Sequence, residues 1–193
     1  MGRSLRETVG LVAALNLGYF GVEFAVALAI GSVSLFADSI DFLEDTSINF
    51  LILAALGWSA RNRARIGMLL AGILLIPGVA TLWTAWQKFL HLAPPPPIPL
   101  TLTGLGALGI NLSCAFMLAR YRDHSGSLTR AAFLSARNDS LANIAIIGAG
   151  ILTAAAASPW PDLVVGLGIA ALNADAAWEV FAAARGEHAA AEP

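Results

Sequence analysis

The chain has 193 residues, of which 58% are hydrophobic and only 12% charged, and its formal net charge is −2. A soluble domain needs a larger polar surface than this composition supplies, so the sequence predicts a membrane protein. The lipid bilayer is an expected partner, whereas nucleic acid is not.

Six apolar segments are long enough to cross a hydrocarbon core of about 30 Å, which requires roughly 20 residues each. These predicted spans cover residues 8–30, 33–58, 66–89, 100–121, 129–157 and 160–184. We therefore expect an all-α fold, a polytopic bundle of six transmembrane helices. Residues 1–184 would form one transmembrane domain, and residues 185–193 a short cytoplasmic tail.

The positive charges are distributed unevenly between the two ends of the predicted spans. One side of the membrane would hold Arg3, Arg6, Arg61, Arg63, Arg65, Arg120, Arg122, Arg130 and Arg185, and the other side only Lys88. Because Lys and Arg accumulate on the cytoplasmic side, both termini are predicted to be cytoplasmic. The expected location is the plasma (inner) membrane.

The first two predicted spans carry polar side chains that a bilayer would not favour. Glu23 and Asn16 lie seven residues apart on span one and could line one cavity. Span two contains four acids within "SLFADSIDFLEDTSINF": Asp38, Asp41, Glu44 and Asp45. A central Asp costs about 2.5 to 3.5 kcal/mol on insertion, and each large apolar residue returns only about 0.3 to 0.6. Span two must therefore turn its acids into a helix bundle.

Helical spacing places most of these acids along one face of span two. Asp38, Asp41 and Asp45 follow an i, i+3, i+7 course that Asn49 extends by one turn. Asp41 and Asp45 can point at one object, and Asp38, nearer the outer surface, is either an access ligand or a helix-end residue. Glu44 lies off this face and is expected to meet another helix or Arg137.

After span three, the segment "HLAPPPPIP" from residue 91 to 99 predicts a stiff extended linker that divides three spans from three. Span four holds the single cysteine, Cys114, which we interpret as a packing residue.

Span five carries a polar stripe in "FLSARNDSLANIAII" that could face the acids of span two. Ser135, Asp139 and Asn143 repeat at i, i+4, i+8, with Asn138 beside them. Carboxylates that face one another at membrane depth would be compensated by a buried divalent cation, and carboxylate, amide and hydroxyl oxygens form a hard site. The candidate metal residues are therefore Asp41, Asp45, Asp139, Ser135, Asn138 and Asn143, with Asp38, Glu23 and Asn49 as possible access or supporting residues.

Several motifs resemble the cation diffusion facilitator family of proton-coupled exporters of divalent metals. "DFLED" in span two and "SARND" in span five are similar to the paired metal-binding motifs of that family, and "GSVSLFADSIDFLED" and "WPDLVVGLGIA" resemble the beginnings of its second and sixth spans. The resemblance covers all six spans and implies metal ligands at Asp41, Asp45 and Asp139. It also implies a homodimer and a transporter, not an enzyme, with no cofactor.

The sequence departs from the family pattern in three places. Ser135 stands where the family usually has His or Asp, which leaves the fourth ligand open between Ser135, Asn138 and Asn143. We expect a short member of the family, without the cytoplasmic domain that usually follows span six. The loop "RDHSGSL" after span four lacks the histidine run of many zinc exporters.

The expected function is efflux of a divalent cation from the cytoplasm through alternating access at the carboxylates of spans two and five. Carboxylates crowded into one buried site cannot all stay ionised, so metal binding would release protons and support antiport. Oxygen ligands favour manganese, iron, cobalt or magnesium, whereas the resemblance favours zinc. Two alternatives stay open: a metal-dependent intramembrane phosphotransferase, and a membrane scaffold that transports nothing.

Overall fold

The structure is a computed structural model that describes residues 4–55, 79–121 and 127–173. Within these residues the chain is helical and contains no strand. The helices are α1 (Leu5–Ile30), α2 (Val33–Ala55), a helix over residues 79–90, α4 (Pro97–Ala119), α5 (Ser127–Ala156) and a last helix, Trp160–Asn173. The all-α prediction is confirmed.

The described helices agree with the predicted spans to within about one turn at the ends that can be compared. Parts of three predicted spans, residues 56–58, 66–78 and 174–184, lie outside the described residues, as does the predicted tail 185–193.

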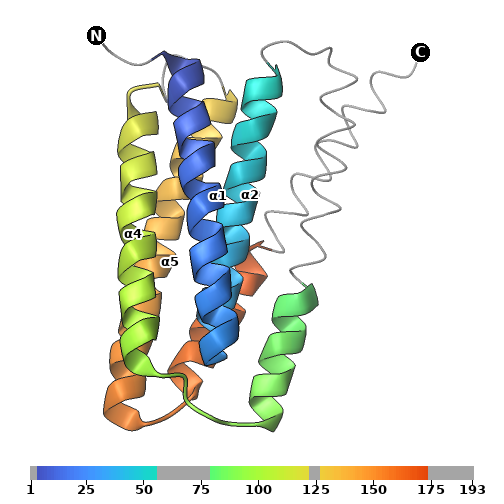
Figure 1. Ribbon diagram of the computed structural model, residues 1–193, viewed down its shortest axis with the longest axis vertical. Helices are drawn as coiled ribbons and strands as arrows, with labels where there is room; N and C mark the ends of the chain where they lie inside the picture. Colours follow the sequence, from blue (N-terminus) through green and yellow to red (C-terminus); the bar gives the residue numbers. More distant parts are fainter. Residues whose placement is uncertain (1–3, 56–78, 122–126, 174–193) are drawn as a thin grey trace, which may run out of the picture.

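The helices run up and down along the long axis of the molecule (Figure 1). α1 packs mainly against α2, and α4 against α5, while α1 also contacts α4 and α2 contacts α5. Three connections lie at the lower end in this view: the turn after α1, the linker over residues 91–96, and the turn after α5. The start of α1 and the end of α4 lie at the opposite end, as an alternating membrane topology requires.

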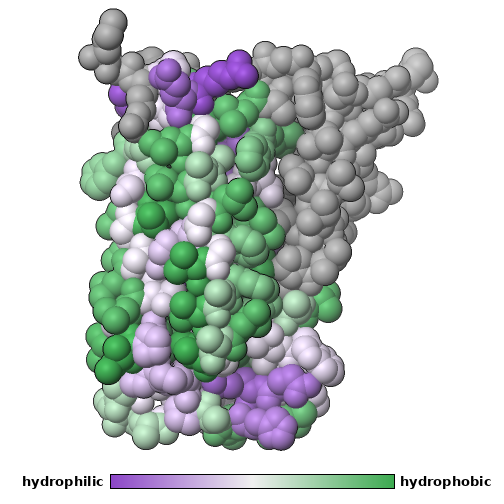
Figure 2. Space-filling view, viewed as in Figure 1, coloured by the Kyte–Doolittle hydropathy of each residue, from purple (hydrophilic) through white to green (hydrophobic). Residues whose placement is uncertain are grey.

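Three helical segments, Leu5–Ile30, Pro97–Ala119 and Ala132–Ala156, are long and apolar enough to cross a membrane. α2 is also long, with 23 residues, but it carries the four acids. Figure 2 shows the corresponding surface: hydrophobic residues cover most of the length of the molecule, and hydrophilic residues gather at its two ends.

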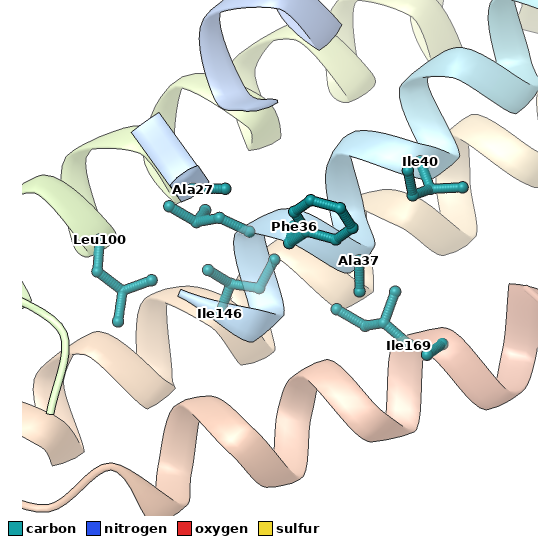
Figure 3. Close-up of a cluster of buried hydrophobic side chains, with 9 residues drawn as sticks. Ala27, Phe36, Ala37, Ile40, Leu100, Ile146 and Ile169 are labelled. Atoms are coloured by element: carbon teal, nitrogen blue, oxygen red, sulfur yellow. The ribbon is translucent and has the colours of Figure 1, made fainter. Parts of the chain in front are cut away.

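One apolar cluster holds the lower half of α2 in place (Figure 3). Its labelled members are Ala27 of α1, Phe36, Ala37 and Ile40 of α2, Leu100 of α4, Ile146 of α5 and Ile169 of the last helix. Because these side chains come from five helices, α2 is fixed at the centre of the bundle and its polar residues are forced inward.

The beginning of α2 is held by residues distant in sequence. Gly31 ends α1 with a φ of 64°, a left-handed conformation that glycine adopts without strain. The carboxylate of Asp162 then accepts hydrogen bonds from Val33 N (3.0 Å), Ser34 N (3.2 Å), Ser34 Oγ (2.7 Å) and Ser32 Oγ (2.6 Å). Lys88 Nζ donates to Gly31 O at 2.7 Å. Asp162 thus satisfies backbone N–H groups that the first turn of a helix leaves unpaired.

The proline segment is only partly as predicted. Residues 92–96 are not helical, but α4 begins at Pro97, so the expected extended linker is shorter than residues 91–99. The expectation was wrong at its end because the first turn of a helix does not use its N–H groups, and proline is well tolerated there.

Candidate metal site

A cavity of about 220 Å³ lies between α2, α5 and the Trp160–Asn173 helix. Its polar lining consists of Asp41 and Glu44 from α2, Ser135, Asn138 and Asp139 from α5, and Asn173 from the last helix. Ala142, Ile169 and Leu172 complete the wall. Four of the predicted metal residues, Asp41, Ser135, Asn138 and Asp139, therefore line one cavity.

Helical periodicity explains why these side chains meet. Ser135, Asn138 and Asp139 occupy positions i, i+3 and i+4 of α5 and therefore share one face of that helix. Asp41 faces them from α2, which packs on α5. No described Lys or Arg side chain lines the cavity, so its three carboxylates have no cationic side chain to compensate them there.

Glu44 differs from the sequence expectation. Three residues along a helix rotate the side chain by about 300°, so Glu44 stands only about 60° from Asp41 and reaches the same cavity. The guanidinium of Arg137, its expected partner, instead donates from Nη2 to Asn138 Oδ1 at 3.3 Å. The expectation that Glu44 lies apart from the site was wrong.

Asp45 lies beside the cavity and is connected to it by Ser135. Ser135 Oγ donates to Asp45 Oδ1 at 2.8 Å, and Asn16 Nδ2 donates to Asp45 Oδ2 at 3.3 Å. Asp45 is 3% exposed, and these two bonds cross from α5 and from α1. The hydroxyl at position 135 therefore orients a carboxylate in this structure.

Asn143 belongs to a different group of side chains, on the side of α2 nearer its beginning. Asn143 Nδ2 donates to Asp38 Oδ2 at 2.6 Å, and Asn143 Oδ1 accepts from Asn111 Nδ2 at 3.0 Å. All three residues are buried. Asn143 and Asp38 therefore do not line the cavity in this structure, although both were grouped with it from the sequence.

The two remaining supporting candidates also lie away from the cavity. Asn49 donates from Nδ2 to the backbone oxygen of Asp45 at 2.7 Å, a bond within its own helix. Glu23 is fully buried next to Asp38.

The three acids that line the cavity do not converge on one point. Among residues 4–55, 79–121 and 127–173, no three His, Cys, Asp or Glu side chains are grouped as they would be around a single bound ion. The cavity is thus an acidic, oxygen-lined space whose walls would have to approach one another to complete a coordination shell.

Sequence reasoning missed three polar residues of this region: Glu44 as a lining residue, Asn173, and Asn111 in the Asn143 network. Asn111 had a detectable signal, since an amide inside an otherwise apolar span points to the bundle interior. Asn173 had none, because its place depends on how the last helix packs.

A family model described as the cation efflux transmembrane domain matches residues 9–186 of the chain. No curated protein matches the chain.

Proposed function

Because the chain belongs to the cation diffusion facilitator family, whose cation efflux domain transports metal cations, we propose that it exports a divalent cation by exchange with protons. The family makes it a multi-pass membrane protein and a metal cation transporter. The export direction, the proton coupling and the binding residues are our proposal.

One observation carries the proposed site: three carboxylates, a hydroxyl and two amides line one cavity between helices from both halves of the chain. We assign Asp41 and Asp139 as primary ligands, with Asp45 moving in from its hydrogen bonds to Ser135 and Asn16. Glu44, Asn138 and Ser135 supply the remaining oxygens. The structure gives Asn143 another partner, so it is left out of this ligand set.

The chemistry of these donors bears on the transported ion. A site made only of oxygens suits manganese, iron or cobalt, whereas the family favours zinc, so these four are the ions to compare. Protons are the natural counter-ion, since several carboxylates that share one cavity release protons when a dication binds.

The arginine distribution supports placing both termini on the cytoplasmic side of the plasma membrane. The resemblance to the family further supports a homodimer. A phosphotransferase and a non-transporting scaffold are the competing functions that a transport assay addresses.

The test is uptake of Zn²⁺, Mn²⁺, Fe²⁺ and Co²⁺ into proteoliposomes under an imposed pH gradient. Wild type should show gradient-dependent flux, and Asp139→Asn should reduce the initial rate at least about tenfold, since a neutral amide cannot compensate the dication.

Asp123→Asn is the matched control, because it makes the same chemical change at a position that the sequence places outside the spans. It should retain wild-type flux. Wild-type flux in Asp139→Asn would overturn the site, and no flux of any ion in wild type would overturn transport in favour of a phosphotransferase or a scaffold.

A further inference from the structure

A second pair of acids lies in the bundle interior, outside the cavity. Glu23 of α1 and Asp38 of α2 are both 0% exposed. Their carboxyl groups lie within hydrogen-bonding reach of each other. Two ionised carboxylates can only accept hydrogen bonds, so either a shared proton or a metal cation must lie between the two groups.

The atoms around this pair show a shortage of donors. Among the described residues, six buried side-chain atoms lack a hydrogen-bond partner, and four of them belong here: Glu23 Oε1, Glu23 Oε2, Asp38 Oδ1 and Asn111 Oδ1. Asn111 is linked to Asp38 through Asn143. Every orphaned atom of the group is an oxygen.

Two described donors near the pair, Tyr19 and Asn143, each already have an acceptor, and neither donates to the orphaned oxygens. Tyr19 Oη donates to Thr103 O at 2.6 Å, and Asn143 Nδ2 gives its bond to Asp38 Oδ2. Leaving buried carboxylate oxygens without a partner is costly, since even a neutral polar group loses about 1 to 3 kcal/mol. Ionisable side chains inside membrane proteins are rare, and they commonly mark the pathways of ions or protons.

We infer that Glu23 and Asp38, with the carbonyl oxygen of Asn111, form a second binding position for the divalent cation. The inference rests on the proposed function. The spacing is suitable: metal–oxygen bonds of about 2.0 to 2.2 Å hold neighbouring ligand oxygens roughly 3 Å apart, which is also hydrogen-bonding distance.

The position of the pair gives it a role in translocation. Asp38 precedes Asp41 by three residues, or about 4.5 Å along the helix axis. It lies towards the beginning of α2, which the predicted topology places at the outer side. An ion that leaves the Asp41 and Asp139 cavity in the outward direction therefore meets Glu23 and Asp38 next.

The test is the number of Mn²⁺ ions bound by the full chain in nanodiscs, measured by equilibrium dialysis and by electron paramagnetic resonance. Wild type should bind about two ions per chain, close enough for their spins to couple. Glu23→Gln and Asp38→Asn should each bind about one and lose the coupling. Glu7→Gln, the same change on the exposed part of α1, should still bind two.

Glu23→Asp covers the case in which Glu23→Gln does not fold: it keeps the charge, shortens the reach, and should weaken the second ion at least about tenfold. One ion in wild type, retained in Glu23→Gln and lost in Asp139→Asn, would overturn the second position and leave the proposed site intact. If Asp139→Asn binds one ion and the double variant Asp139→Asn, Glu23→Gln binds none, the second position is supported even if the flux assay fails.

Discussion

At the scale of single residues, position 135 connects the candidate site to the rest of the bundle. Ser135 lines the cavity and at the same time donates to Asp45 at 2.8 Å. In the family that the chain resembles, His or Asp usually occupies this place. A hydroxyl is a weaker ligand than either, so the proposed site would rely on carboxylates and amides and would be harder than an imidazole-containing one.

Replacing Ser135 by His should therefore shift metal preference. We expect Ser135→His to raise the Zn²⁺ to Mn²⁺ transport ratio at least about fivefold, because imidazole binds zinc well and manganese poorly. Competitive uptake of both ions in one proteoliposome preparation measures the ratio. Ser135→Ala is the control for loss of the hydroxyl alone, and an equal ratio in all three proteins would remove Ser135 from the site.

At the scale of helices, the contact between α2 and the last helix depends on a missing side chain. A Cβ at Gly166 would lie 2.7 Å from Ser34 N and from the carbonyl carbon of Val33, too close for any neighbour that is backbone. Gly168, in the same helix, faces open space. The beginning of α2 can therefore pack this closely on the last helix only because residue 166 has no side chain.

This difference gives a matched pair of variants. Gly166→Ala should lower the thermal unfolding midpoint in detergent by several degrees, because the two helices must separate and the Asp162 hydrogen bonds lengthen. Gly168→Ala should leave the midpoint unchanged or slightly raised, since alanine favours helix. Equal unfolding midpoints for Gly166→Ala and Gly168→Ala would refute the close contact at residue 166.

Asp162 itself should matter more than any other single cap in the described structure. It is fully buried and receives four hydrogen bonds, so Asp162→Ala orphans several donors at once. We expect a loss of about 2 to 4 kcal/mol in unfolding free energy. Denaturant titration followed by Trp fluorescence measures it. Asp162→Asn, which keeps one acceptor oxygen, should lose less, and an Asp162→Ala protein as stable as wild type would refute the capping role.

At the scale of the whole molecule, topology is the property with the widest consequences. The one native thiol, Cys114, is buried and should stay silent towards a membrane-impermeant maleimide. A cysteine at exposed Ala93, in the linker before α4, should be labelled from outside intact cells, and one at Gly2 only after lysis. The reverse pattern would invert the proposed orientation and turn export into import.

The sequence was sufficient for the parts of this fold that depend on local pattern. Span length and the i, i+4 spacing of Asp41 with Asp45 and of Ser135 with Asp139 each follow from one helix considered alone, whereas the orientation indicated by the arginines stays a prediction. The roles of Glu44, Asn111 and Asn143 do not, because they depend on the rotation of one helix against another. The partners of Asp162 likewise come from packing between α2 and a helix more than a hundred residues away in sequence.

The hydrogen bonds between Asp162 and the first turn of α2 also bear on how far the acids of α2 can move. A helix of 23 residues is about 34 Å long, and Asp41 and Asp45 stand about 12 to 18 Å from its beginning. If Asp162 keeps that end fixed while α2 tilts by about 10°, the two carboxylates move by roughly 2 to 3 Å and the far end by about 6 Å. A displacement of 2 to 3 Å is about one metal–oxygen bond length, roughly the difference between holding an ion and releasing it. A small rotation about this pivot would therefore move the proposed ligands Asp41 and Asp45 by about one metal–oxygen bond length.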